Sequence, residues 1–266
     1  KLTFLTNAAC IYEADGFRLL SDPWLSESCF LGQWLHDPPI TTRPEDLVDV
    51  DALYISHIHE DHADPETLRH FRRDIPIVCF NDQFTVRHLE RMGFTAVTAP
   101  VWLRLGPFKL TLFGPFCKHP HVDCDVGNVI DSALLVEHGG VKVLNCNDNT
   151  PTTGTAKLLA TEHGPFDVAQ INYNCAGPYP ACFDNLTWEQ KRAEHFRLIQ
   201  RNLTHMVDVA KGLKPRYVMP FAGAYKLANE ALNPVLGTTT PEHAAARAQL
   251  AGFETIVLAE GESFEL

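Results

Sequence analysis

Short apolar runs separated by turn residues dominate the chain, and most are too short to be helices. Runs at residues 2–6, 10–14 and 17–21 predict an initial set of strands, with a tight turn at 15–16. Further strands are predicted at 51–55, 76–80, 103–116 (two strands around a Gly-Pro turn), 130–137, 141–144, 168–173, 217–220, 255–258 and 263–266. Residues 26–42 show no regular period, so we expect a long irregular loop there.

Helical periodicity appears between several of these strands, near residues 65–73, 83–92, 187–212 and 241–251. The clearest helix begins at Thr187, which forms a capping box with Gln190. Apolar residues then recur three and four apart: Phe196, Ile199, Leu203, Met206, Ala210 and Leu213. This stripe predicts a face packed on the core, with a partner surface as the alternative. The order of strands and helices indicates an α/β chain.

Composition limits the number of domains and the kinds of partner that we expect. The chain has 266 residues with 45% hydrophobic content, enough for one substantial core, and we expect a single domain over 1–266. A net charge of −11 without a basic cluster argues against a nucleic-acid partner. No apolar run reaches the length of a membrane span, and the eight cysteines show no CxxC pair. A cytoplasmic protein with reduced thiols is the expectation.

The segment 56–62 concentrates the candidate chemistry. It reads Ser-His-Ile-His-Glu-Asp-His and follows the apolar strand at 51–55, so three imidazoles and two carboxylates fall within seven residues. In an extended strand, His57 and His59 would lie on the same face, and Asp61 and His62 would follow in the turn. Such crowding has little packing value, and it is typical of metal ligands.

His57-Ile58-His59-Glu60-Asp61-His62 resembles the HxHxDH signature of the metallo-β-lactamase superfamily. The resemblance implies a four-layer αββα sandwich with metals at one edge. It further implies that His57 and His59 bind one ion and that Asp61 and His62 bind a second. Asp61 is also a candidate catalytic group, because a carboxylate at that position could accept a proton.

Two more ligands are expected farther along the chain. Asp148 occupies the position where the family has an aspartate that bridges both ions, and we take it as a ligand and a catalytic residue. Its alternative role is an Asx turn that closes the preceding strand. The third histidine of the first ion is assigned to His119. His121 and the carboxylates Asp123 and Asp125 compete with it for that role.

The chain departs from the family at the last ligand. Hydrolases of the superfamily have a histidine after the late strand, but this chain has Phe221-Ala222-Gly223 there. The second ion is therefore held by fewer protein ligands, or a group such as Glu230 or His243 replaces the histidine, or only the first ion binds. A weakly held second ion follows from the first of these possibilities.

Together, several segments resemble the metallo-β-lactamase-like domain of CMP-N-acetylneuraminic acid hydroxylases. They are Asp22-Pro-Trp24, the core at 55–62, 143–148, Cys175-Ala-Gly177-Pro-Tyr-Pro180 and Pro220-Phe-Ala-Gly223. Those enzymes also have a Rieske domain, and this chain contains no pair of Cys-x-His segments for such a cluster. The resemblance implies an iron oxygenase that depends on an external electron donor.

The sequence therefore predicts two divalent ions, with iron favoured and zinc as the alternative. A non-haem iron oxygenase acting on a small polar substrate is preferred. A dinuclear zinc hydrolase of an ester, amide or phosphodiester is the alternative, and a non-catalytic metal-binding protein is the third hypothesis. The loop at 172–181 follows a strand end and offers Tyr173, Asn174 and Tyr179 as substrate contacts. Its alternative role is that of a rigid Gly-Pro turn.

Overall fold

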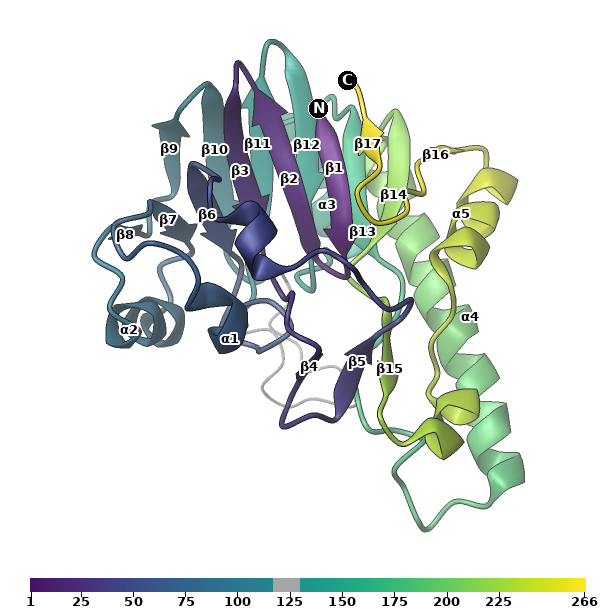
Figure 1. Cartoon of the computed structure of the whole chain (residues 1–266). Coiled ribbons are helices and arrows are strands. Elements are labelled where there is room, and N and C mark those ends of the chain that lie inside the picture. Colours follow the sequence, from purple (N-terminus) through teal and green to yellow (C-terminus); the bar gives the residue numbers. More distant parts are fainter. Residues whose placement is uncertain (117–129) are drawn as a thin grey trace.

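The computed structural model of this chain describes residues 1–116 and 130–266, and two seven-stranded sheets face each other in it (Figure 1). The first sheet has the order β17-β1-β2-β3-β6-β7-β8. Its strands are β1 (Leu2–Thr6), β2 (Ala9–Ala14), β3 (Phe17–Ser21), β6 (Ala52–Ile55), β7 (Ile77–Cys79), β8 (Val97–Thr98) and β17 (Ser263–Phe264). The strands β3, β6, β7 and β8 run parallel, so their carboxyl ends meet at one edge of the sheet.

The second sheet has the order β16-β14-β13-β12-β11-β10-β9. Its strands are β9 (Trp102–Leu105), β10 (Phe108–Phe113), β11 (Ala133–His138), β12 (Val141–Asn145), β13 (Val168–Asn172), β14 (Tyr217–Phe221) and β16 (Glu254–Thr255). The strands β12, β13, β14 and β16 are parallel, whereas β9, β10 and β11 are antiparallel to their neighbours.

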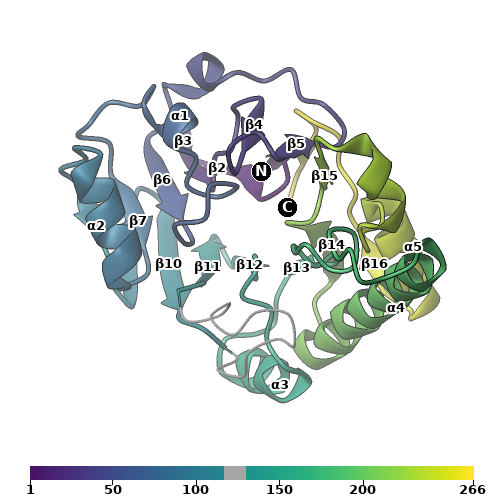
Figure 2. The ribbon, with the colours of Figure 1, turned by 90° about the horizontal axis from the view of Figure 1, so that it is seen from below.

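Helices cover the outer face of each sheet. Beside the first sheet lie α1 (Pro65–Leu68) and α2 (Gln83–Arg91), and beside the second lie α3 (Thr153–Glu162), α4 (Trp188–Leu213) and α5 (Pro241–Leu250) (Figures 1 and 2). One apolar cluster fills the space between the sheets, and two others lie between each sheet and its helices. The predicted four-layer αββα sandwich is confirmed.

The prediction of an irregular loop at 26–42 is partly wrong. Two short strands form there, β4 (Ser28–Cys29) and β5 (Trp34–His36). β4 pairs with β5, and β5 pairs with β15 (Tyr225–Leu227), which gives a third sheet. The partner β15 lies almost two hundred residues away, so no local period could reveal the pairing. Trp34 stacks on Tyr225 with ring centroids 3.8 Å apart and anchors the contact.

Four helical elements also differ from expectation, and one of them is the unpredicted 3-10 turn η1 (Pro44–Leu47). The helix that begins at Pro65 ends at Leu68, well before residue 73. The helix α3 was not predicted, and η2 (Glu230–Val235) adds a 3-10 turn. In α4 the capping box of Thr187 and Gln190 is present, and the stripe from Ile199 onward is buried against the second sheet. Phe196, however, is 65% exposed, because this part of α4 extends beyond the sheet (Figure 1).

Within the described residues, no helix is long and apolar enough to cross a membrane. Among the cysteines in this part of the chain, Cys10, Cys29, Cys79, Cys146 and Cys182 are free thiols. The cytoplasmic setting and the single domain over 1–266 stay predictions.

Candidate metal centre

The predicted ligands that the structure describes follow β6 and β12, whose carboxyl ends lie at the lower edge of the sandwich in Figure 1. Figure 2 views this edge end-on. The strand β6 is buried throughout and ends at Ile55. His57 and His59 therefore lie in the segment after the strand, and the expectation that both project from one strand face is wrong. A turn sets their positions, because His62 N and Ala63 N both donate to His59 O, at 3.0 and 2.8 Å.

The first group of candidate ligands joins His57, His59 and Asp131. One ligand atom from each lies within 4.8 Å of the others. His57 Nε2 is 2.8 Å from His59 Nδ1 and 3.6 Å from Asp131 Oδ1. His57 and Asp131 are buried, whereas His59 is exposed. Two imidazoles and a carboxylate at these distances could hold one divalent ion.

The position of Asp131 is set by hydrogen bonds at the start of β11, the strand that follows it. The next residue, Ser132, donates its hydroxyl to Ser56 O at 2.7 Å, and Tyr54 OH lies 2.8 Å from the same hydroxyl oxygen. These bonds join the start of β11 in one sheet to the end of β6 in the other. The carboxylate of Asp131 is thereby held beside His57.

The second group joins His62, Asp148 and again His57. His62 Nε2 is 3.3 Å from Asp61 Oδ2 and 3.4 Å from Asp148 Oδ2. This nitrogen is buried and has no hydrogen-bond partner among the described residues. Because His57 belongs to both groups, the two sets of candidate ligands form one cluster.

Asp22 orients His62 from behind. Its Oδ2 is 3.0 Å from His62 Nδ1 and also accepts a bond from Asn147 Nδ2, while its Oδ1 accepts one from Ser56 N at 2.7 Å. A carboxylate at Nδ1 fixes the proton on that nitrogen and leaves Nε2 free to ligate. Asp22 itself has φ +40, in the left-handed region, so the chain accepts backbone strain to place this carboxylate.

The charges of the cluster are unbalanced without a cation. Burial and the neighbouring Asp148 raise the pKa of Asp131 to about 8. Burial and the nearby His62 lower the pKa of His57 well below its usual range. Burial opposes the charged form of His62, but Asp61 and Asp148 outweigh it and raise the pKa of His62. An ion would stabilise the ionised carboxylates and the neutral imidazoles together.

These observations fit a metal centre. The unpartnered Nε2 of His62 faces two carboxylates, its Nδ1 is held by Asp22, and Asp131 is buried beside two imidazoles. Buried groups of this kind are costly unless something compensates them, and a divalent ion bonded to Nε2 and to the carboxylates would do so.

The position of the missing histidine is occupied by backbone. Ala222 has φ +54, its N donates to Asn7 O at 3.1 Å, and its O accepts a bond from Asn172 Nδ2 at 2.7 Å. The same Asn172 Nδ2 donates to Asp148 Oδ1 at 2.9 Å. An amide therefore links Ala222 to the candidate bridging aspartate, and it fixes the carboxylate of Asp148 without supplying a ligand.

Neither of the two side chains that could replace this histidine lies at the cluster. Glu230 is exposed at the start of η2, and His243 is exposed on α5, where its Nδ1 is 2.7 Å from Thr239 Oγ1. Neither belongs to a candidate ligand group of the described residues. The choice between His119, His121, Asp123 and Asp125 lies outside the described residues.

The three predicted substrate contacts have different surroundings. The side chain of Asn174 is fully engaged: its Nδ2 donates to Gly223 O and Thr239 O, and its Oδ1 accepts from Thr239 N. Tyr179 lies at the surface, edge-on to Phe183. Tyr173 is buried, and its hydroxyl has no hydrogen-bond partner in residues 1–116 and 130–266.

Sequence reasoning missed Asp131, Asn172 and the role of Asp22. The motif Asp22-Pro23-Trp24 carried part of the family resemblance, and an aspartate directly after a buried strand was the available signal. For Asp131 the signal was weaker, because it precedes its strand and reaches the site only through the packing of the two sheets.

Comparison with known proteins agrees with this geometry. A family model described as "Beta-lactamase superfamily domain" matches residues 17–221. The chain belongs to the metallo-β-lactamase superfamily. It thus has the fold and the ligand motif of a superfamily of metal-dependent enzymes, as predicted.

A cytidine monophosphate-N-acetylneuraminic acid hydroxylase from Danio rerio is 30% identical over 257 residues, which cover 90% of this chain and 40% of that protein. The chain spans about two fifths of the length of the curated relatives it matches.

Solved structures share the fold. A possible metal-dependent hydrolase from Veillonella parvula superposes with a TM-score of 0.70 at 17% identity, covering 100% of this chain and 98% of that one. The diiron β-hydroxylase CmlA from Streptomyces venezuelae superposes with a TM-score of 0.65 at 19% identity, covering 100% of this chain and 54% of that one. The same sandwich is therefore present in a hydrolase and in a hydroxylase.

Proposed function

We propose that this protein is a non-haem iron oxygenase of the metallo-β-lactamase superfamily that hydroxylates a small polar substrate at a site for two iron ions. The observation that carries the proposal is the carboxylate-rich ligand set. Three aspartates, Asp61, Asp131 and Asp148, accompany the three imidazoles of the motif. Mixed imidazole and carboxylate ligands with open positions suit iron, whereas structural zinc favours closed sulfur and nitrogen sets.

Each ion has its own proposed ligands. His57, His59 and Asp131 would hold the first, and Asp61, His62 and Asp148 the second. Asp148 would also bridge to the first ion, because its group shares His57 with the other. When bound, iron would supply the one-electron and oxygen chemistry that side chains lack.

The protein groups would then bind, orient and move protons. Asp22 and Asn172 would hold His62 and Asp148 in ligating positions. Asp61 lies 3.3 Å from His62 Nε2, and it is the proposed proton acceptor. Tyr173, Asn174 and Tyr179 remain the proposed substrate contacts, and Tyr173 is the one with a free hydroxyl.

The relatives support an oxygenase. Hydroxylases occur among both the curated relatives and the structural neighbours. An external electron donor is part of the proposal, because hydroxylation of one substrate molecule by O₂, with release of one water, consumes two electrons that the side chains do not supply.

A dinuclear zinc hydrolase is the second candidate. The three imidazoles of the motif are good zinc ligands, and two ions sharing a bridging carboxylate suit hydrolysis of an ester, amide or phosphodiester. This chain has Ala222 where hydrolases of the superfamily have a histidine. The second ion would then have only one nitrogen ligand among the described residues, which disfavours the zinc hydrolase.

Metal-dependent turnover distinguishes the two candidates. We expect iron-loaded protein with a reductant to consume O₂ when a panel of small polar substrates includes an accepted one, and zinc-loaded protein to consume none. The double variant His57→Ala/His59→Ala is the control, and it should lose metal and O₂ uptake while its circular dichroism is retained. Ester or phosphodiester cleavage by the zinc form, without O₂ uptake by the iron form, would establish the hydrolase instead.

A further inference from the structure

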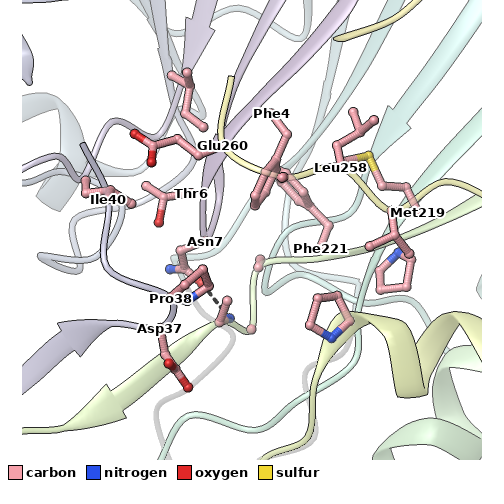
Figure 3. Close-up of a pocket in the computed structure, with 18 of the residues that line it drawn as sticks. Phe4, Thr6, Asn7, Asp37, Pro38, Ile40, Met219, Phe221, Leu258 and Glu260 are labelled. Carbon is pink, nitrogen blue, oxygen red and sulfur yellow. Dashed lines mark hydrogen bonds between the residues drawn. The ribbon is translucent and has the colours of Figure 1, made fainter. Parts of the chain in front are cut away.

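A cavity of about 170 Å³ lies beside the metal centre, between the ends of β1 and β14, the segment at 37–40 and the C-terminal segment at 257–260 (Figure 3). None of the candidate metal ligands lines it. An apolar cavity of about 150 Å³ can hold a benzene molecule, so this one has room for a ring and a short substituent.

The walls of the cavity are largely apolar. Phe4, Met219, Phe221 and Leu258 gather on one side, and Asp37 lies at the opposite end beside Pro38 (Figure 3). Phe4 and Phe221 meet edge to face, with ring centroids 6.3 Å apart. A flat apolar group in this space would contact two aromatic rings, and a cation near them would gain a further attraction.

Two buried polar groups at the cavity have unused hydrogen-bonding capacity. Tyr173 is only 2% exposed, and its hydroxyl has no partner in the described part of the chain. Asn7 is 4% exposed, and its Oδ1 accepts a bond from Ala224 N at 3.3 Å while its Nδ2 donates to none of the described residues. Both residues line the cavity, and neither of these two atoms is sealed from solvent, so both are available to a ligand bound there.

Tyr173 is influenced by the acidic rim of the cavity. Burial raises the pKa of Tyr173, and the carboxylates of Glu242 and Asp37, both of which line the cavity, raise it further. Gly223 leaves room for the ring: a Cβ added there would lie 3.1 Å from Cε1 of Tyr173 and 3.3 Å from its Cζ.

The charged residues of the lining are all acidic: Asp37, Glu242 and Glu260. Glu260 is engaged with Thr41 and Thr42, but the carboxylates of Asp37 and Glu242 are exposed and make no hydrogen bond or ion pair in residues 1–116 and 130–266. An occupant with a positive charge would therefore be favoured over a neutral or anionic one of the same shape.

We propose that this cavity is a binding site for a small organic cation, an apolar ring or chain carrying a protonated amine. The apolar body packs against Phe4, Phe221 and Leu258. The ammonium group donates to the Tyr173 hydroxyl oxygen and lies near Asp37 and Glu242. The site concerns binding alone, and it does not depend on which metal or which reaction the neighbouring centre supports.

Benzylammonium, benzyl alcohol and benzoate are matched probes, because they share a ring and differ in charge. Titration calorimetry on the full chain, with metal removed by chelation, should show benzylammonium binding at least about tenfold more tightly than benzyl alcohol, the effect of one charge-assisted hydrogen bond. Benzoate should not bind. Equal binding of the amine and the alcohol, or no binding of the amine at millimolar concentration, would overturn the proposal.

Two sets of variants locate the binding. Tyr173→Phe removes only the hydroxyl, so it should weaken benzylammonium about tenfold and benzyl alcohol by less. Asp37→Asn/Glu242→Gln removes the rim charge, so it should weaken benzylammonium about tenfold and leave benzyl alcohol unchanged. Glu189→Gln/Glu254→Gln is the matched control, since it removes the same charge at exposed sites elsewhere. If the control weakens the amine as much as the rim variant, the attraction is general and the cavity is not the site.

Discussion

At the scale of single residues, the proposed metal centre depends most on Asp131, a buried carboxylate in one of the two candidate ligand groups. It is buried 3.6 Å from His57 Nε2, and burial and Asp148 together raise its pKa to about 8. A carboxyl group with such a pKa is mostly protonated at neutral pH, and a bound cation would favour its ionised form, so metal binding and the ionisation of Asp131 would be linked.

The variant Asp131→Asn should keep the shape of the site and lose one ligand charge. We expect elemental analysis to show a fall from two ions per chain toward one, and turnover to drop by orders of magnitude. Asp184→Asn, at an exposed position, is the control and should bind two ions. Two tightly bound ions in Asp131→Asn would remove Asp131 from the ligand set.

Asp22 is not a candidate ligand itself, but it contacts the candidate ligand His62. Because its Oδ2 holds His62 Nδ1, Asp22→Asn should lower the affinity of the second ion by about 10- to 100-fold, the usual effect of losing a carboxylate behind a metal-bound histidine. Competition with a chelating dye measures this affinity. The variant His62→Ala sets the scale, and it should lose the second ion altogether. Unchanged affinity in Asp22→Asn would leave Asp22 with a purely structural role.

At the scale of elements, the sequence predicted most strands well and the surroundings of the motif less well. The strand before the motif is where the apolar run at 51–55 placed it. Strand alternation, however, could not describe His57 and His59, because the strand ends at Ile55 and hydrogen bonds to His59 O close a turn over residues 59–63. The alternation of apolar residues in the sequence is enough to predict a strand. The path of the chain after β6 depends in addition on Asp22, which follows β3 and whose carboxylate accepts a hydrogen bond from Ser56 N.

The strand β5 carries a buried histidine whose protonation should destabilise the fold. His36 stacks on Trp24 at 3.9 Å, its Nε2 is 2.9 Å from Ser26 O and its Nδ1 is 3.0 Å from Thr6 Oγ1. Burial lowers the pKa of His36, although the bond to Ser26 partly opposes the shift. The unfolded chain, with a pKa of about 6.5, therefore binds the proton more readily, so this contribution to stability is complete above about pH 6.5 and is lost as the pH falls.

Urea unfolding at pH 7.5 and pH 5.5 tests this linkage. We expect His36→Gln to be less stable than the unmodified protein at pH 7.5, and to lose less additional stability on acidification. His243→Gln, at an exposed position, should behave like the unmodified protein at both values. An identical loss on acidification in His36→Gln and the unmodified protein would show that His36 does not titrate in this range.

At the scale of the whole molecule, the sandwich assembles a site that no single segment contains. The first sheet supplies the turn after β6, and the second supplies Asp131 before β11 and Asp148 after β12. The sequence could identify the ligand motif because four of its ligands lie within six residues. It could not identify Asp131 or Asn172, since their approach depends on how two sheets from distant parts of the chain pack together.

The same assembly predicts that metal stabilises the whole sandwich. The ions would join the two sheets at one edge, and only the folded chain brings these ligands together. At a free metal concentration about 100 times the dissociation constant, linkage adds about 2.7 kcal/mol to the free energy of unfolding, or roughly 5–10 °C in Tm for a chain of this size.

Calorimetry with and without a chelator should show this shift while far-ultraviolet circular dichroism changes little at 25 °C. His57→Ala/His59→Ala should melt at the same temperature in both conditions, because it has already lost the first ion and the ligand shared with the second. A chelator that leaves Tm unchanged in the unmodified protein would mean that the sheets are joined without metal, and the ligand assignment would fall with it.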